Sequence, residues 1–233
     1  MNRSSFSTGL GLIHALIIIL LLSALSPLAI AGPPASDQYD SIIKDALKLE
    51  EAGKVQEALD LYILAMPMSR DRAEPWARAS ILQLILNKPK IALATATRAV
   101  DLEPAHRGAW LNKSVIELAS GMNKEALSTT QKALKRFPED TDLMNNMATA
   151  LIGLRKYNTA EDLLLEALKI KPSDSSIHYN LACTYALSDI KMTALIYLEK
   201  AIALDPSLKK NARTDPDLRK IRDLKPFKEL TSD

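Results

Sequence analysis

The chain has 233 residues, with 30 lysines and arginines against 28 acidic residues and a net charge of +2. This near balance argues against a nucleic-acid partner, because binding by counterion release needs a concentrated basic face. The single cysteine, Cys183, excludes an internal disulfide, so packing alone must stabilise the fold.

The N-terminal segment, residues 1–31, has the pattern of a secretory signal peptide. It starts with a basic residue and no acidic one, continues as an apolar run over 10–25, and meets a breaker at Pro27. A small-x-small motif ends at Ala31, so we predict cleavage there and export to the periplasm or the medium. An uncleaved inner-membrane anchor is the alternative, since residues 10–31 are long enough to span a bilayer.

Residues 32–38 follow as a short linker, because two consecutive prolines favour an extended spacer. Helical patterning is expected from about Gln38–Ser41 onward.

From residue 39 to residue 208, small side chains recur every 34 residues. One register holds Ala58, Ala92, Ala126, Ala160 and Ala194. A second register, seven residues later, holds Ala65, Ala99, Ala133, Ala167 and Ala201. A third holds Ala46, Ser80, Ser114, Ala148 and Ala182. A fixed period of this length indicates a tandem repeat array.

Each 34-residue unit reads as a helical hairpin, because two helical runs flank a break near its fifteenth residue. Antiparallel helices approach closely only where the side chains at their crossing are small, and the first and third registers supply such residues on opposite arms. Proline, which cannot continue a helix, then recurs near the end of the unit. These prolines are Pro104, Pro138, Pro172 and Pro206.

The pattern resembles the tetratricopeptide repeat (TPR) family. Trp76 and Trp110 occupy the family's early tryptophan position, Gly53 and Gly121 the turn between the helices, and Tyr62 the later aromatic position. The resemblance implies an all-α, right-handed superhelical solenoid of five TPR hairpins plus a C-terminal capping helix. The five repeats are 39–72, 73–106, 107–140, 141–174 and 175–208.

The first repeat departs from this pattern. Arg70 stands where the other repeats have proline, and Pro67 comes three residues early. We therefore expect its second helix to end early.

Residues 209–233 are expected to form the capping helix and a tail. Leu218, Ile221, Leu224 and Phe227 are spaced as one apolar stripe, which would cover the exposed face of the fifth repeat.

No constellation of residues predicts catalysis. His106 falls in a loop between repeats, and His178 takes the position held by Trp76 and Trp110, where we expect it to pack at a repeat interface. Neither histidine has metal-ligand spacing, and Cys183 has no histidine placed to activate it. We predict no catalytic site, no metal, no cofactor and no enzymatic activity.

The concave face, built by the first helices of the repeats, is the predicted binding site. In the family, position 6 of each repeat lines this groove, and here it holds Lys44, Arg78, Asn112, Asn146 and Asn180. The asparagine amides are placed to hydrogen-bond an extended peptide backbone. Leu111 and Val115 belong to an apolar seat in the first three repeats, and Tyr179 to a hydrogen-bonding seat in the last two.

These features predict an exported scaffold that binds a protein or peptide in its groove, as an adaptor or assembly factor. The alternative is a structural, membrane-anchored subunit of a cell-envelope complex. The family's groove for acidic chaperone tails needs a lysine at position 5 and an asparagine at position 9 of one repeat, and no repeat here has that pair. A membrane is a partner only if the N-terminal segment stays uncleaved, and the partner and oligomeric state stay open.

Overall fold

The computed structural model describes residues 35–68 and 71–232, so the predicted signal segment lies outside the described residues. The chain divides into two units, residues 1–40 and 41–233, and the repeats belong to the second. In the first unit the described residues, 35–40, are helical. Helix α2 thus begins at Ala35, inside the predicted linker, because no breaker follows Pro34 and Asp37 in its first turn favours the positive helix end.

The described residues form helices joined by short turns, and no strand occurs among residues 35–68 and 71–232. None of the helices described combines the length and apolar character needed to cross a membrane. Their bounds are α2 Ala35–Glu51, α3 Val55–Ala65, η1 Met66–Met68, α4 Glu74–Ile85, α5 Pro89–Leu102, α6 Arg107–Ala119, α7 Asn123–Leu134, α8 Thr141–Gly153, α9 Tyr157–Ile170, α10 Ser175–Leu187, α11 Lys191–Leu204, α12 Leu208–Thr214, η2 Pro216–Leu218 and α13 Lys225–Thr231.

The three small-residue registers are buried throughout the array. All fifteen of their residues have 0% of their surface exposed, including the two serines, Ser80 and Ser114. The predicted close helix crossings are therefore confirmed, because a larger side chain at any of these positions would have no room without backbone movement.

The turn inside each hairpin repeats with the same period in its backbone geometry. Five described residues have positive φ, between 57° and 71°, and they are 34 residues apart: Gly53, Asn87, Gly121, Arg155 and Asp189. Glycine adopts this conformation at low cost, and asparagine and aspartate tolerate it, whereas arginine is strained there. The turn is thus dictated by the hairpin and not by glycine alone.

Each second helix ends before the recurring proline, as expected. Helix α5 ends two residues before Pro104, and α9 and α11 end likewise. In the first repeat α3 ends at Ala65, and Pro67 lies in the short 3-10 turn η1. The prediction of an early end is confirmed.

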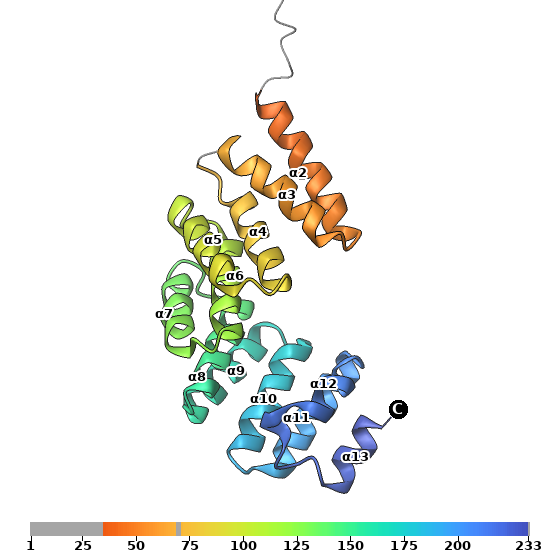
Figure 1. The fold of residues 1–233 in the computed structure, drawn as a ribbon. Helices are drawn as coiled ribbons and strands as arrows, with labels where there is room; N and C mark the ends of the chain where they lie inside the picture. The colour runs from red at the N-terminus through yellow and green to blue at the C-terminus, as the bar shows by residue number, and fades with distance from the viewer. Residues whose placement is uncertain (1–34, 69–70, 233) are drawn as a thin grey trace, which may run out of the picture. The chain divides into compact units, whose positions relative to one another are not determined.

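The repeats stack so that the two helices of each hairpin occupy different layers. First helices pack directly against one another, α4 on α6, α6 on α8 and α8 on α10, whereas successive second helices make at most marginal contacts. The first helices of neighbouring repeats are thus closer to one another than the second helices are. The stack of repeats therefore curves toward the first helices, which line its inner face. Figure 1 shows the succession of hairpins from α4 and α5 to α10 and α11.

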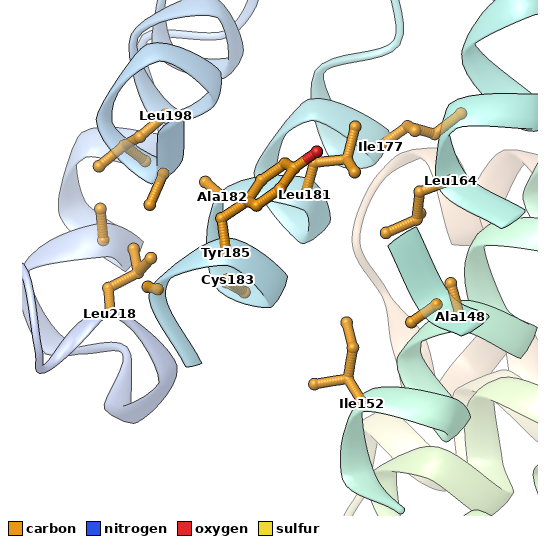
Figure 2. Close-up of a cluster of buried hydrophobic side chains, with 14 of the residues drawn as sticks. Ala148, Ile152, Leu164, Ile177, Leu181, Ala182, Cys183, Tyr185, Leu198 and Leu218 are labelled. Atoms are coloured by element: carbon orange, nitrogen blue, oxygen red, sulfur yellow. The ribbon is translucent and has the colours of Figure 1, made fainter. Parts of the chain in front are cut away.

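The core is a series of local clusters, as expected when each repeat contacts only its neighbours. The largest joins the fourth and fifth repeats to the C-terminal segment (Figure 2). In it, Leu164 of α9 and Leu181 of α10 share one buried cluster with Leu218 of η2.

The C-terminal segment covers the fifth repeat, but it is not one helix. Leu218, Ile221 and Phe227 are buried against that repeat from η2, a following turn and α13 in succession. Pro216 and Pro226 stand in the first turns of η2 and α13, where a proline starts a new helix but cannot continue an old one. The predicted single apolar stripe is therefore wrong, although its residues do form the cap.

Candidate peptide-binding groove

Two hollows open on the inner face of residues 41–233, both beside α6. The first has a volume of about 280 Å³ and lies between α4 and α6, with Glu50 of α2 at its edge. It is lined by Glu50, Glu74, Ala77, Arg78, Ile81, His106, Gly108 and Asn112. We call it the arginine hollow, after Arg78 at its centre.

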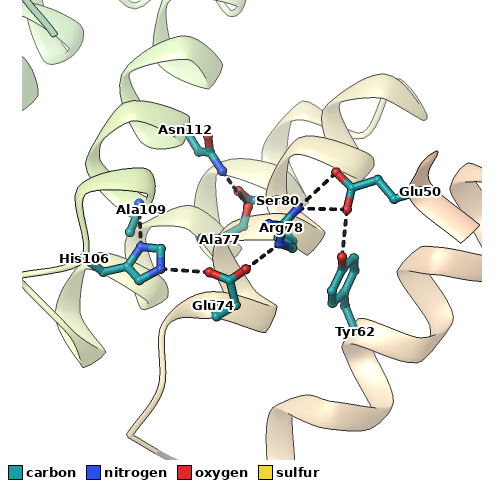
Figure 3. Close-up of polar contacts among 9 residues, drawn as sticks. All are labelled: Glu50, Tyr62, Glu74, Ala77, Arg78, Ser80, His106, Ala109 and Asn112. Atoms are coloured by element: carbon teal, nitrogen blue, oxygen red, sulfur yellow. Dashed lines mark hydrogen bonds and ion pairs between the residues drawn. The ribbon is translucent and has the colours of Figure 1, made fainter. Parts of the chain in front are cut away.

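Charged side chains of the first and second repeats meet in the arginine hollow (Figure 3). Arg78 Nε donates a hydrogen bond to Glu74 Oε1. Arg78 Nη1 donates a second one, of 3.3 Å, to Glu50 Oε2. Glu50 Oε2 also accepts a hydrogen bond of 2.7 Å from the hydroxyl of Tyr62. The guanidinium is thus held between two carboxylates from different repeats.

His106 joins this network as a neutral imidazole. Its Nδ1 accepts a hydrogen bond from the backbone N–H of Ala109 and so caps α6, which requires Nδ1 to be unprotonated. Its Nε2 then carries the proton and donates to Glu74 Oε2 at 3.0 Å. Burial by itself raises the pKa of Glu74, but the hydrogen bonds from Arg78 and His106 outweigh it and hold the pKa below its ordinary value.

The second hollow, of about 210 Å³, lies where α6, α8 and the start of α10 meet. Its lining residues are Leu111, Val115, Asp142, Asn145, Asn146, Asp174 and Ser176. Apolar side chains of the third repeat therefore face polar side chains of the fourth and fifth. We call it the aspartate hollow.

The asparagines of position 6 have a role between repeats that the sequence pattern does not reveal. Each amide donates to the first helix of the preceding repeat: Asn112 to the carbonyl of Ala77, Asn146 to Ser114 Oγ, and Asn180 to Asn145 Oδ1, at 2.8 to 2.9 Å. These bonds use an N–H that was expected to meet a peptide. Asn112 and Asn146 nevertheless line the arginine and aspartate hollows respectively.

The fifth repeat presents its groove residues to the chain's own C-terminal segment. The Tyr179 hydroxyl donates to Asp215 Oδ2 at 2.8 Å, and α10 packs against η2. Burial, with the hydrogen bond to Asp215 next in importance, raises the pKa of Tyr179. Tyr179 and Asn180 line neither hollow, so the hydrogen-bonding seat predicted for the fifth repeat is occupied by the chain itself.

Of the remaining predicted residues, Arg78 and the pair Leu111 and Val115 line hollows, whereas Lys44 is exposed on α2 and lines neither. Sequence reasoning missed the acidic lining. Glu74 and Asp142 stand at position 2 of their repeats, and Asp174 caps α10 as His106 caps α6. The available signal was the recurrence of helix caps every 34 residues, at His106, Asp140 and Asp174.

One group of described side chains lies close enough to share a metal ion: Cys183, Asp215 and Asp217 offer ligand atoms within 4.8 Å of one another. Burial, and next the charge of Asp215, raise the pKa of the Cys183 thiol well above its ordinary value, which disfavours the thiolate that a metal needs. The absence of a metal stays a prediction.

Family models described as "Tetratricopeptide repeat" match residues 80–141 and 117–182. Residues 80–182 therefore carry tetratricopeptide repeats. The two matched ranges cover parts of the second to fifth TPR hairpins, where the alanine registers and the inner-face hollows lie. Both models describe a repeat and not an enzyme, and no curated protein matches the sequence significantly.

Solved TPR structures share this fold. The thermophilic TPR protein TTC0263 of Thermus thermophilus has a TM-score of 0.63 at 22% identity, over 78% of this chain and 95% of its own. MamA from residue 41 onward, from Desulfovibrio magneticus RS-1, has a TM-score of 0.63 at 20% identity, over 76% and 98%. YrrB, described as a TPR protein with an unusual peptide-binding site, has a TM-score of 0.56 at 19% identity, over 75% and 93%. At these identities the likeness concerns the fold.

Proposed function

We propose that the inner face binds an extended segment of a partner protein, and that the chain works as an exported scaffold or adaptor. The observation that carries this proposal is the pair of hollows along one face. Each has apolar side chains beside hydrogen-bonding groups, which is the usual make-up of a ligand site. The peptide-binding site named for YrrB supports the same class of ligand on this fold.

Paired substitutions on α6 test the groove. Leu111→Glu with Val115→Lys places two charges on the floor of the aspartate hollow, where both side chains are partly exposed. Because neither residue is fully buried, we expect the helical circular dichroism to stay unchanged while capture of partner proteins from a cell-envelope extract is lost.

The matched control is Met192→Glu with Ile196→Lys. These residues have the same four-residue spacing on a second helix, α11, and are 66% and 50% exposed. We expect the control to capture the same proteins as the wild type. Equal capture by the α6 variant, or loss only in the α11 control, would overturn the assignment of the groove.

Export is the second part of the proposal, and it rests on the signal-like pattern of residues 1–31. N-terminal sequencing of the mature protein distinguishes the candidate functions. A start at Gly32 supports a free scaffold in the periplasm or medium. A start at Met1 supports the membrane-anchored structural subunit. Residues 10–31 are long and apolar enough to serve as its membrane anchor.

A further inference from the structure

We propose that the segment bound in the groove is cationic, with lysine or arginine at every third position and apolar residues between them. This inference rests on the proposed peptide-binding function and names the chemistry of the partner. It starts from the charges of the described residues that line the two hollows. Four carboxylates line them, and the only lining cation is Arg78; the carboxylates belong to Glu50, Glu74, Asp142 and Asp174.

In the arginine hollow the one cation among the described lining residues is already paired. Arg78 contacts Glu74 through Nε and Glu50 through Nη1, and His106 is neutral because its Nδ1 accepts the N–H of Ala109. Two carboxylates therefore stand against one guanidinium. The side chains of Glu50, Glu74 and Arg78 are 33%, 37% and 36% exposed, so an incoming group can reach them.

In the aspartate hollow no cation is among the lining residues that the structure describes. The nearest cations approach from outside. Arg107 pairs with both Asp140 and Asp142, and Lys171 pairs with Asp174 at 2.7 Å. Asp174 keeps its charge, because hydrogen bonds from Lys171 and two backbone N–H groups outweigh the effect of burial and hold its pKa below the ordinary value.

Counting these outer partners does not reverse the sign. Five carboxylates then stand against three cations, while the whole chain is positive at +2. The acidic character is thus local to the groove. An anionic peptide would meet excess negative charge in both hollows, whereas a cationic one would be attracted there, and such complementarity selects partners.

The apolar part of the ligand follows from the floor between the acidic groups. Ile81 lines the arginine hollow, and Leu111 and Val115 line the aspartate hollow. Neighbouring first helices lie about 8–10 Å apart, a distance that about three residues of an extended polyproline II segment cover. Such a segment has three residues per turn, so every third side chain lies on the same side. A basic side chain at every third position, with leucine or alanine between, therefore fits the two hollows.

The test uses three labelled peptides on residues 32–233 and on the full chain, with binding followed by fluorescence anisotropy. The probes are Lys-Leu-Ala-Lys-Leu-Ala-Lys and its versions with each lysine replaced by glutamate or by glutamine, all with blocked ends. We expect the lysine peptide to bind about tenfold more tightly than the glutamate peptide, and its affinity to fall as salt rises.

Charge-removing variants connect that preference to the hollows. Glu74→Gln with Asp142→Asn takes one charge from each hollow, and we expect it to weaken the lysine peptide about tenfold. Glu57→Gln with Asp60→Asn makes the same change on exposed positions of α3, outside both hollows, and should leave binding unchanged. Circular dichroism of all variants checks that they fold.

The outcomes separate this inference from the proposed function. Equal or tighter binding of the glutamate or glutamine peptide, abolished by Leu111→Glu with Val115→Lys, would overturn the cationic ligand but retain the groove. Lysine-peptide binding that survives Glu74→Gln with Asp142→Asn would also overturn it. If none of the peptides binds while partner capture still depends on α6, the ligand chemistry is wrong; if that dependence is absent too, the proposed function falls.

Discussion

Trp110 and His178 make the same hydrogen bond at equivalent places two repeats apart. Trp110 Nε1 donates to the carbonyl of Pro104, and His178 Nε2 donates to the carbonyl of Pro172, at 2.9 Å in both cases. Both rings are buried, with 8% and 7% exposed. A histidine at the tryptophan position is thus a smaller ring that keeps the tie between a first helix and the loop before it, which confirms its expected packing at a repeat interface.

Removing this tie should cost stability in both repeats. We expect Trp110→Phe and His178→Phe each to lower the free energy of unfolding by about 1 kcal/mol. The loss stays this small because Pro104 and Pro172 are exposed, so that their freed carbonyls can bind water. Urea denaturation followed by circular dichroism measures the loss. Unchanged stability in both variants would show that the bond contributes nothing to the fold.

The alanine registers predict the effect of overpacking. Ala126 has no exposed surface, so Ala126→Leu should lower the free energy of unfolding by roughly 1–3 kcal/mol. Ala94→Leu adds the same side chain at an exposed position of α5 and should be nearly neutral. Denaturation midpoints of the two variants decide the point, and a tolerated leucine at 126 would contradict the close crossing.

The strained hairpin turn predicts a gain in stability. Arg155 has φ of 59°, in the region that costs an L-residue roughly 1–2 kcal/mol, and Gly53 and Gly121 hold the equivalent places. We expect Arg155→Gly to stabilise the fold by about 1 kcal/mol. Lys156→Gly is the control. Lys156 has an ordinary φ of −92°, so glycine there relieves no strain and only increases the conformational entropy lost on folding.

Thermal unfolding of these two variants gives opposite shifts if the strain is real. A rise in the melting temperature is expected for Arg155→Gly and a fall for Lys156→Gly. A fall in both would show that the arginine side chain contributes more than its backbone costs.

A buried carboxylate predicts a dependence on pH. Glu117 accepts a hydrogen bond from Thr129 at 3.1 Å through Oε1, while its buried Oε2 has no hydrogen-bond partner among the described residues. Burial raises the pKa of Glu117 above the ordinary 4.5. Because the folded state binds the proton more tightly, this group's contribution to stability is present below pH 4.5 and is lost as pH rises through the raised pKa.

Glu117→Gln removes this loss, since the amide is neutral at every pH. The free energy of unfolding of the variant relative to the wild type should therefore increase as pH rises above 4.5, measured by urea denaturation at several pH values. Glu139→Gln, at an exposed position after α7, is the control and should follow the wild type. A constant difference across pH would contradict the buried, proton-binding carboxyl.

The acidic groove marks the limit of reasoning from position alone. Reading position 6 predicts Arg78 as a groove residue, but it does not reveal that the structure places Arg78 between Glu50 and Glu74, 28 and 4 residues away. Similarly, the side-chain amide of Asn180 donates hydrogen bonds to Asn145 and Thr149 of the preceding repeat. Such pairings depend on side-chain reach across a repeat boundary, and a register of equivalent positions does not contain that information.

The sequence by itself determined the hairpins, their number, their buried small residues and the early end of α3. It could do so because close helix crossings and helix stops depend on residue size and on proline, both of which are read directly at a fixed period. Only the tertiary structure decided which charges meet in the groove, how the C-terminal segment bends at Pro216 and Pro226, and that Asp215 takes the hydroxyl of Tyr179. Those outcomes come from contacts between parts of the chain that no single repeat encodes.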